Sequence, residues 1–194
     1  MEKDQINRSQ HLIVIGGSSG SLDAILKILS HLDVGFSIPI VIVVHRNPTA
    51  GEVLASILAA KTNLLVKEAD EKENILKGHI YLAPPDYHLL IETDYTLSLD
   101  ASEKINYSRP SIDVTFYSAA DVYVGNLTCV LLSGANADGT EGMDYAKQMG
   151  AKIIVQDPLD ASVSYMPQHA IAKVPVDGIF DTKGIANFLN KLKD

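Results

Sequence analysis

The sequence has very little cysteine. Cys129 is the only one among 194 residues, so no intrachain disulfide can form. It lies within the apolar run 127–132, where a thiol usually behaves as a small buried hydrophobic group. No residue beside it is of a kind that activates a thiol. We therefore expect Cys129 to be structural, and disulfide-rich folds are excluded.

The sequence also lacks long apolar runs and an excess of basic residues. No stretch approaches the ~20 residues that a membrane-spanning helix needs, and the first ten residues are polar, unlike a secretory signal. Lys and Arg number 16 against 24 Asp and Glu, giving a formal net charge of -8. Because nucleic-acid binding needs clustered Lys and Arg, we expect no nucleic-acid partner. We expect a cytoplasmic protein without direct membrane insertion.

Common ligand-binding patterns are absent as well. The sequence has no His-x-x-x-His or paired-cysteine spacing of the kind that binds zinc. No P-loop lysine follows its first glycine-rich turn, and the dinucleotide pattern Gly-x-Gly-x-x-Gly fails there because serines occupy the required positions. We expect neither a metal nor an organic cofactor.

What the sequence does contain is an alternation of short apolar runs with amphipathic segments. The runs 11–17, 39–45, 127–133 and 151–156 have the length of buried strands, and 176–180 fits an edge strand. Helices are expected near 21–32, 54–58, 111–123, 140–149, 167–173 and 185–192, with Ser21 and Ser111 as caps of two of them. Such alternation predicts an α/β fold with a doubly wound, mostly parallel sheet in three layers, α/β/α.

The middle of the chain departs from this alternation. Short strand candidates at 64–67, 79–83, 88–92 and 96–99 are separated by Gly, Pro and Asp turns. This spacing predicts antiparallel hairpins inserted into the fold. No internal repeat or interdomain linker is evident, and the length suits one domain with a substantial core. We expect residues 1–10 to form a polar extension and residues 11–194 a single domain.

Residues 16–20 read Gly-Gly-Ser-Ser-Gly and fit the spacing Gly-x-Ser-x-Gly. Small neighbours in this spacing allow a sharp strand-to-helix turn that exposes the serine hydroxyl, here that of Ser18. The backbone N–H of Ser19 follows near a helix N-terminus, where the helix dipole favours a developing oxyanion. Ser18 is therefore a candidate nucleophile and Ser19 a candidate oxyanion donor. A phosphate-binding glycine turn is the alternative interpretation.

A serine nucleophile needs a general base, and His45 has the most suitable position among six histidines. It closes the apolar run 39–45, which follows the first strand–helix unit. Ligands bind outside the carboxyl ends of parallel strands, so Ser18 and His45 should face the same edge of the sheet. A histidine in an ordinary turn is the alternative. His79 and His88 fall in the hairpin region and fit a core or surface role better.

Asp138 is the candidate for the carboxylate that orients the histidine. It lies in the glycine-containing loop 134–139, after the strand run 127–133 and just before an expected helix. An N-cap carboxylate for that helix is the structural alternative. Asp157 and Asp160, in the loop after the next strand, lack the glycine-flanked setting. The order Ser, His, Asp differs from the order in the α/β-hydrolases, which indicates a different scaffold.

These motifs resemble the catalytic domain of chemotaxis protein-glutamate methylesterases of the CheB type. The resemblance rests on His45, the Gly-Gly-Ser-Ser-Gly segment, Arg-Pro-Ser-Ile-Asp at 109–113 and the loop 133–139. Further matches are the segments 77–84 and 165–167, and the motifs occur in the family's order along nearly the whole chain.

The resemblance implies hydrolysis of glutamyl γ-methyl esters on the cytoplasmic helices of methyl-accepting chemotaxis receptors, with release of methanol, and often deamidation of receptor glutamines. It maps the nucleophile to Ser18, the base to His45 and the orienting carboxylate to Asp138, and it places Arg109 at the border of the site.

The sequence departs from the family pattern in several places. Ser19 stands where threonine is common, Ser21 where a glycine is common, and Ala135 where familiar members have a methionine near the site. A side-chain role in oxyanion binding at position 135 is therefore in doubt. Familiar members also carry a phosphorylation-regulated receiver domain, which these 194 residues do not include.

Two other interpretations stay open. One is an esterase of the same fold with a substrate outside chemotaxis, and the other is a catalytically silent receptor-binding module. The presence of Ser18, His45 and Asp138 argues against the silent module, because such a module need not keep them.

Overall fold

A computed structural model describes residues 9–46 and 51–192. Its largest element is a seven-stranded sheet of order β3-β4-β2-β1-β7-β8-β9, in which all neighbouring strands are parallel. Two further strands, β5 and β6, form an antiparallel hairpin. The strands are β1 (Leu12–Gly17), β2 (Ile40–Val44), β3 (Leu65–Glu68), β4 (His79–Leu82), β5 (His88–Ile91), β6 (Leu97–Asp100), β7 (Leu127–Leu131), β8 (Lys152–Gln156) and β9 (Gly178–Phe180). The helices are α2 (Ser21–Ser30), α3 (Gly51–Ala59), α4 (Ile112–Val122), α5 (Thr140–Gln148), α6 (Tyr165–Lys173) and α7 (Thr182–Leu189).

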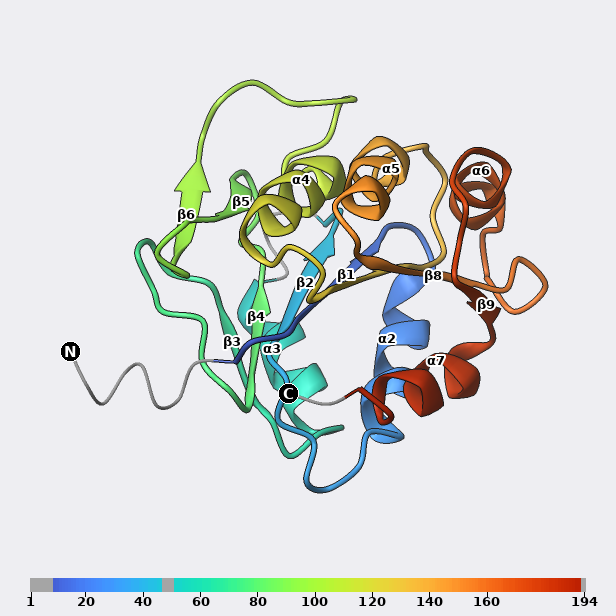
Figure 1. Cartoon of the computed structure of the whole chain (residues 1–194). Helices are drawn as coiled ribbons and strands as arrows, with labels where there is room; N and C mark the ends of the chain where they lie inside the picture. The colour runs from blue at the N-terminus through green and yellow to red at the C-terminus, as the bar shows by residue number, and fades with distance from the viewer. Residues whose placement is uncertain (1–8, 47–50, 193–194) are drawn as a thin grey trace.

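Helices cover both faces of the sheet and produce three layers. In Figure 1, α4, α5 and α6 lie above the sheet, whereas α2, α3 and α7 lie below it. Side chains of β1 alternate between the two cores: Leu12 and Val14 pack on the α4 side, and Ile13 and Ile15 pack on the α2 side. Every residue of β1 is buried, as expected for a central strand of a parallel sheet covered on both faces. The doubly wound α/β/α fold predicted from the sequence is confirmed.

The β5–β6 hairpin packs on α4, beside the sheet rather than within it. Leu89 and Leu97 belong to the same apolar core as Phe116 of α4. The Thr115 hydroxyl of this helix donates a hydrogen bond to the Leu89 carbonyl oxygen at 2.7 Å. The hairpin is thus an insertion between β4 and α4, as the sequence indicated.

The prediction of antiparallel hairpins is wrong for the first two strands of the middle region. β3 and β4 pair in parallel, with Leu65 opposite His79, and β4 pairs in turn with β2 of the main sheet. Parallel neighbours cannot be joined by a tight turn. Residues 69–78 therefore cross back along the sheet, and Ala69 and Ile75 are buried on the way. Turn-forming residues in this crossover resemble those of a hairpin when only the sequence is read.

Cys129 is completely buried in β7, and burial raises the pKa of its thiol well above the usual value. The expectation of a structural cysteine is confirmed.

Within residues 9–46 and 51–192, no helix combines the length and apolar character needed to cross a membrane. Most of the proposed polar extension 1–10, the loop around Pro48 and the last two residues lie outside the described residues. The division of the chain into an extension and one domain stays a prediction.

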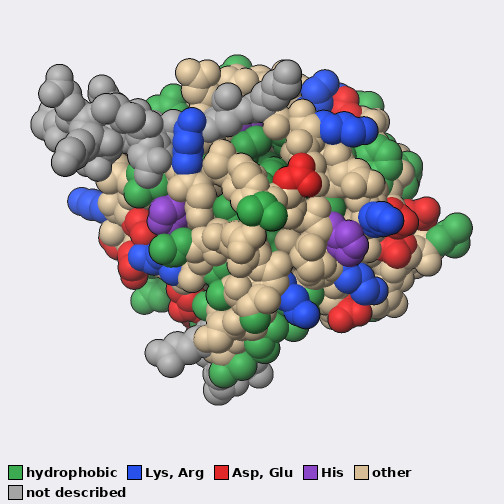
Figure 2. Space-filling model, turned by 90° about the horizontal axis from the view of Figure 1, so that it is seen from below, with side chains coloured by type: hydrophobic (Ala, Val, Ile, Leu, Met, Phe, Trp, Pro, Cys, Tyr) green, Lys and Arg blue, Asp and Glu red, His purple; other side chains and the backbone are tan. Residues whose placement is uncertain are grey.

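Charged side chains on the lower face are mixed in sign. Figure 2 shows acidic and basic groups interspersed with apolar ones over this surface. On α2, Lys27 Nζ lies 3.6 Å from Asp23 Oδ2, and both side chains are exposed. Pairs of this kind contribute little to stability because water screens them.

Candidate active site

Three loops meet at the carboxyl end of the parallel sheet. β1 lies between β2 and β7, so the residues that follow these three strands are neighbours in space although they are far apart in the chain. Ser18 follows β1 directly, His45 follows β2 directly, and Asp138 lies in the loop between β7 and α5. This is the edge at which doubly wound sheets bind ligands.

His45 joins the other two residues through its two ring nitrogens. Its Nδ1 lies 3.1 Å from the Ser18 hydroxyl oxygen, and its Nε2 lies 2.7 Å from the Asp138 carboxylate. The Asp138 side chain is fully buried, whereas that of His45 keeps 15% of its surface exposed. The three side chains thus form a continuous hydrogen-bonded chain that is open to solvent at its serine end. Such a chain can activate a serine hydroxyl for attack on a carbonyl.

The turn that carries Ser18 depends on its glycines and on local hydrogen bonds. The Ser18 N–H donates to the Ser133 carbonyl oxygen at 2.9 Å, which ties the turn to the end of β7. Gly20 has φ 79°, and a Cβ there would lie 2.7 Å from the Ser162 Cβ. Gly20, rather than Ser21, is the N-cap residue of α2. The prediction of Ser21 as a cap is wrong, because its hydroxyl donates back to the Ser18 carbonyl oxygen at 2.7 Å.

The Asp138 carboxylate is held by four donors besides His45. It accepts hydrogen bonds from the Ser111 hydroxyl at 2.9 Å and from the backbone N–H groups of Ile112, Asp113 and Gly139 at 2.7, 3.1 and 3.0 Å. Ile112 and Asp113 are the first residues of α4, so Asp138 fills the role of a cap for that helix. The alternative of a cap for the helix that follows it, α5, is wrong, because Gly139 is the N-cap there.

These contacts decide the charge of the Asp138 carboxyl. Burial raises its pKa, but the hydrogen bonds from His45 and from the Ile112 and Asp113 amides outweigh burial and hold the pKa below the ordinary value. The neighbouring Asp113 carboxyl behaves in the opposite way, since burial first and the nearby Asp138 charge next raise its pKa to about 7. One carboxylate charge therefore sits beside His45, where it can balance a developing imidazolium.

Ser111 occupies the predicted N-cap position of α4 but does not cap it with its side chain. Its hydroxyl is turned to Asp138 instead, and its backbone N–H donates to His88 Nδ1 at 3.0 Å. His88 is buried and its Nε2 lies 3.0 Å from the Glu103 carbonyl oxygen, so of the core and surface roles expected for it the core role is observed.

The predicted neighbours of the triad differ in what they do. Ser19 is exposed next to Ser18, and its carbonyl oxygen accepts from the Ser133 hydroxyl at 2.7 Å. Arg109 is half-buried and donates to the carbonyl oxygens of Ala101 and Ser102 at 2.8 and 2.6 Å, so it fastens the segment before α4. Ala135 is exposed at the start of the loop that carries Asp138.

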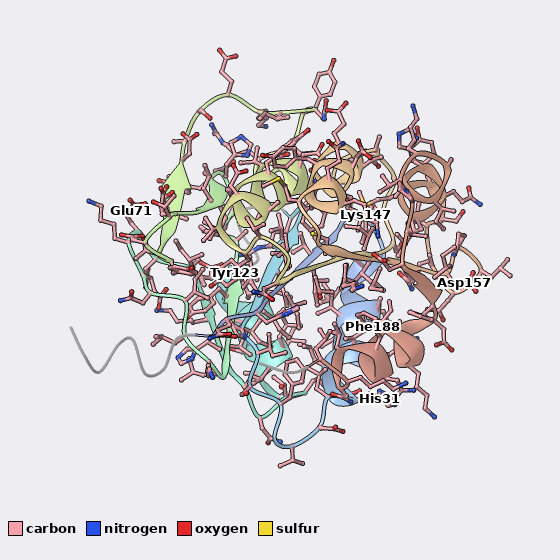
Figure 3. The ribbon with its side chains drawn as sticks, viewed as in Figure 1. His31, Glu71, Tyr123, Lys147, Asp157 and Phe188 are labelled. Carbon is pink, nitrogen blue, oxygen red and sulfur yellow. The ribbon has the colours of Figure 1, made fainter. Side chains whose placement is uncertain are left out.

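The rejected candidates for the acidic group lie elsewhere. Asp157 accepts from the Leu159 N–H at 2.9 Å, and Asp160 accepts from the Gln156 side chain at 2.9 Å. Figure 3 shows Asp157 at the outer edge of the molecule, beyond β8. Neither residue is hydrogen-bonded to His45, so the choice of Asp138 over these two agrees with the geometry.

Two hollows flank His45. One, of about 280 Å³, has mainly apolar walls from α2 and α3, including Leu22, Ile25 and Ile57, and it reaches Ser18. The other, of about 410 Å³, is lined by His45 with Arg46, Asp86, Lys104 and Arg109 among its polar walls. A substrate bound at Ser18 would therefore meet an apolar surface on one side and a mainly basic one on the other.

Sequence reasoning missed two residues of this site. Arg46 is half-buried as a residue, with 7% of its side chain exposed. It pairs with Glu68 and donates to the Ala83 carbonyl oxygen at 3.1 Å, which joins the end of β2 to β3 and β4. The amide of Asn136 lies 3.3 Å from His45 Nδ1. Both are sequence neighbours of predicted residues, and that adjacency was the only signal available.

Among the described residues, no cluster of His, Cys, Asp and Glu has the arrangement of a metal site.

The model of the family described as CheB methylesterase matches residues 13–189. The chain belongs to the CheB methylesterase family. It is 45% identical to a putative protein-glutamate methylesterase/protein-glutamine glutaminase of Leptospira interrogans serogroup Icterohaemorrhagiae serovar copenhageni, over 93% of each chain. It is 34% identical to the protein-glutamate methylesterase/protein-glutamine glutaminase of Thermotoga maritima over 95% of this chain, which spans about half, 54%, of that longer relative.

The fold agrees with this CheB family assignment. The crystal structure of the Thermotoga maritima CheB methylesterase catalytic domain matches with a TM-score of 0.92 at 33% identity, over 96% of this chain and 100% of the other. The family resemblance inferred from the motifs is thereby confirmed.

Proposed function

We propose that Ser18, His45 and Asp138 are the catalytic triad with which this chain hydrolyses glutamyl γ-methyl esters of chemotaxis receptors. The observation that carries the proposal is the bridging position of His45, 3.1 Å from the Ser18 hydroxyl and 2.7 Å from Asp138. Membership of the CheB methylesterase family makes the chain a hydrolase of methyl esters, and the contacts of His45 support these three residues for that reaction.

The reaction starts with proton transfer from Ser18 to His45. The serine oxygen attacks the ester carbonyl carbon as its proton moves to Nδ1, and the carbonyl electron pair moves to the oxygen. Asp138 stabilises the resulting imidazolium through Nε2. Collapse of the tetrahedral intermediate expels methanol, which takes the proton from Nδ1. Water then attacks the acyl-enzyme by the same route and releases the glutamate carboxylate.

Deamidation of glutamine side chains requires only a change of leaving group. An amide carbonyl is attacked in the same manner and ammonia leaves in place of methanol, so one triad serves both reactions. The names of the Leptospira and Thermotoga relatives join the two activities, which supports the same pair here. We place the reaction in the cytoplasm, on the receptor helices.

The two hollows beside His45 suit a protein substrate better than a free small ester. Methanol is far smaller than the apolar hollow of about 280 Å³, so the alcohol does not need this space. An apolar side chain near the modified glutamate would fill it, while Lys104 and Arg109 on the other side favour acidic neighbours. A methylated receptor segment with both features fits this surface.

The test is the release of labelled methanol from receptor membranes that carry radiolabelled methyl glutamate. The wild-type chain should release the label, and Ser18→Ala should lower the rate by several orders of magnitude, as for other triad serines. Equal release by the two proteins would contradict the triad. Release from a small glutamyl ester but not from receptor membranes would favour the esterase with another substrate, and receptor binding without any release would favour the silent module.

A further inference from the structure

Asn136 lies in the loop between β7 and α5 with both ends of its side-chain amide engaged. Its Oδ1 accepts a hydrogen bond from the Asp138 N–H at 3.1 Å. Its Nδ2 lies 3.3 Å from His45 Nδ1, the ring nitrogen that also faces the Ser18 hydroxyl. Because the backbone N–H of Asp138 can only donate, the oxygen of the amide must face it, and the NH₂ group must face His45.

This contact determines which nitrogen of neutral His45 carries the proton. An amide NH₂ group has no acceptor, so Nδ1 must be the unprotonated nitrogen. The proton then resides on Nε2 and is donated to Asp138 at 2.7 Å. The Ser18 hydroxyl and the Asn136 amide consequently share one lone pair, that of Nδ1, and neutral His45 is held in the form that can remove the serine proton.

We propose that Asn136 is a further catalytic residue, whose side-chain amide donates to His45 Nδ1 in the resting enzyme and to the substrate oxyanion once Nδ1 is protonated. This inference rests on the proposed function of the triad. When Ser18 attacks, its O–H bond breaks and an Nδ1–H bond forms, so Nδ1 no longer has a lone pair to accept from Asn136. At the same step the carbonyl electron pair becomes an oxyanion on the carbon that is newly bonded to Ser18.

The amide of Asn136 therefore loses its acceptor at the moment when a better one appears nearby. Its donation is stronger in the transition state than in the resting enzyme, which is the condition for accelerating the reaction. When the intermediate collapses, the oxyanion becomes a carbonyl again, the Nδ1 proton leaves with methanol, and Asn136 can return to Nδ1. Position 135, an alanine, offers no polar side chain for this task, so Asn136 supplies the donor beside the Ser19 amide.

Two substitutions separate this role from a structural one. Asn136→Asp keeps an oxygen that accepts from the Asp138 N–H but removes the donor, whereas Asn136→Ala removes both. If Asn136 donates to the oxyanion, both variants should lower kcat by about 10²–10³-fold with KM within about threefold of wild type. If Asn136 only holds the loop through Asp138, Asn136→Asp should keep wild-type kcat, and this result would overturn the proposal.

Asn190 offers a matched control. It also accepts a backbone N–H through Oδ1, from Asp33 at 3.0 Å, and donates through Nδ2, to the His31 carbonyl oxygen at 2.9 Å. Figure 3 shows His31, which follows the C-terminal end of α2, and Phe188 of α7. Because Asn190 is hydrogen-bonded to His31, the length of α2 separates Asn190 from Ser18. Asn190→Asp should leave kcat within about twofold of wild type, so a loss confined to position 136 identifies the site.

Nitrogen NMR of the His45 ring gives a readout that does not depend on turnover. Two-bond correlations of the neutral ring in the wild-type protein should place the proton on Nε2. A neutral ring with its proton on Nδ1 would overturn the proposal. An inactive wild type would overturn the proposed function together with this inference, whereas an active wild type with fully active Asn136→Asp would overturn this inference alone.

Discussion

The Asp138 carboxylate accepts the backbone N–H of Ile112 at 2.7 Å, the same distance at which it meets His45 Nε2. The group that orients the histidine is therefore also the cap of helix α4. The partial positive charge at this helix end favours the carboxylate form, and the helix loses its cap if the carboxylate is removed. With Asp138 in the proposed triad, catalysis and the start of α4 are coupled through one side chain.

This coupling leads us to expect two separate losses in Asp138→Asn. An asparagine cannot accept from His45 Nε2–H and from all of its other donors at once, so the ring loses its orientation. We expect kcat to fall by ~10³–10⁴-fold, as for comparable triad substitutions. The free energy of unfolding should also fall, by ~1–3 kcal/mol, because a buried donor is left unpaired.

Methanol release and urea denaturation measure these two losses. Asp157→Asn is the control, since Asp157 follows β8 and is hydrogen-bonded to the Leu159 N–H rather than to the histidine. Normal stability together with normal turnover in Asp138→Asn would refute the coupling.

The buried Asp113 should make stability depend on pH. Burial and the charge of Asp138 raise its pKa to about 7, whereas an unfolded aspartate titrates near ~3.9. Between these values the folded state keeps a proton that the unfolded state has lost, so stability decreases as pH rises through this window. Asp113→Asn removes this titration and can still accept from the Gly142 N–H, which lies 2.7 Å from the carboxylate.

We expect Asp113→Asn to be more stable than wild type by ~1–3 kcal/mol at pH 8 and to differ little near pH ~4. Denaturation at both pH values measures this difference, with the exposed Asp23→Asn as control. A difference that is the same at both pH values would mean that Asp113 is ionised throughout the range.

The turn that carries Ser18 should not tolerate a side chain at Gly20. Its φ of 79° disfavours other residues, and a Cβ would lie 2.7 Å from the Ser162 Cβ and 2.9 Å from the Ser133 hydroxyl. We expect Gly20→Ala to lose ~1–3 kcal/mol of stability and to slow methanol release, because the turn must shift Ser18. Gly35→Ala is the control, since nothing lies within 4 Å of its Cβ position. Equal effects of the two substitutions would show that the turn is not constrained.

The proximity of Ser18, His45 and Asp138 and the layers of the fold could be predicted because they follow from rules that act along the chain. Ser18 directly follows one apolar run and His45 closes another, and the carboxyl ends of parallel strands meet at one edge. The environment of Asp138 could not be predicted, since its donors Ser111 and Ile112 come from a segment more than twenty residues earlier. Local rules instead suggested a cap for the next helix, α5.

Two further features depend on tertiary structure. The sequence between β3 and β4 has the composition of a turn, and only the pairing of β4 with β2 shows that it is a crossover. The contact between Asn136 and His45 depends on the course of the loop after β7, which carries no periodic pattern. Sequence periodicity reports burial along one helix or strand, so it does not predict the contacts that loops make.

The central claim is that Ser18 and His45 act as one unit, and a double-mutant cycle tests it most directly. Methanol release would be measured for wild type, Ser18→Ala, His45→Ala and the double variant at one saturating substrate concentration. Because His45 acts only through the Ser18 proton, each single substitution should cost several orders of magnitude and the double variant little more than either. Losses that multiply in the double variant would contradict the account, because they would mean that a different base activates Ser18.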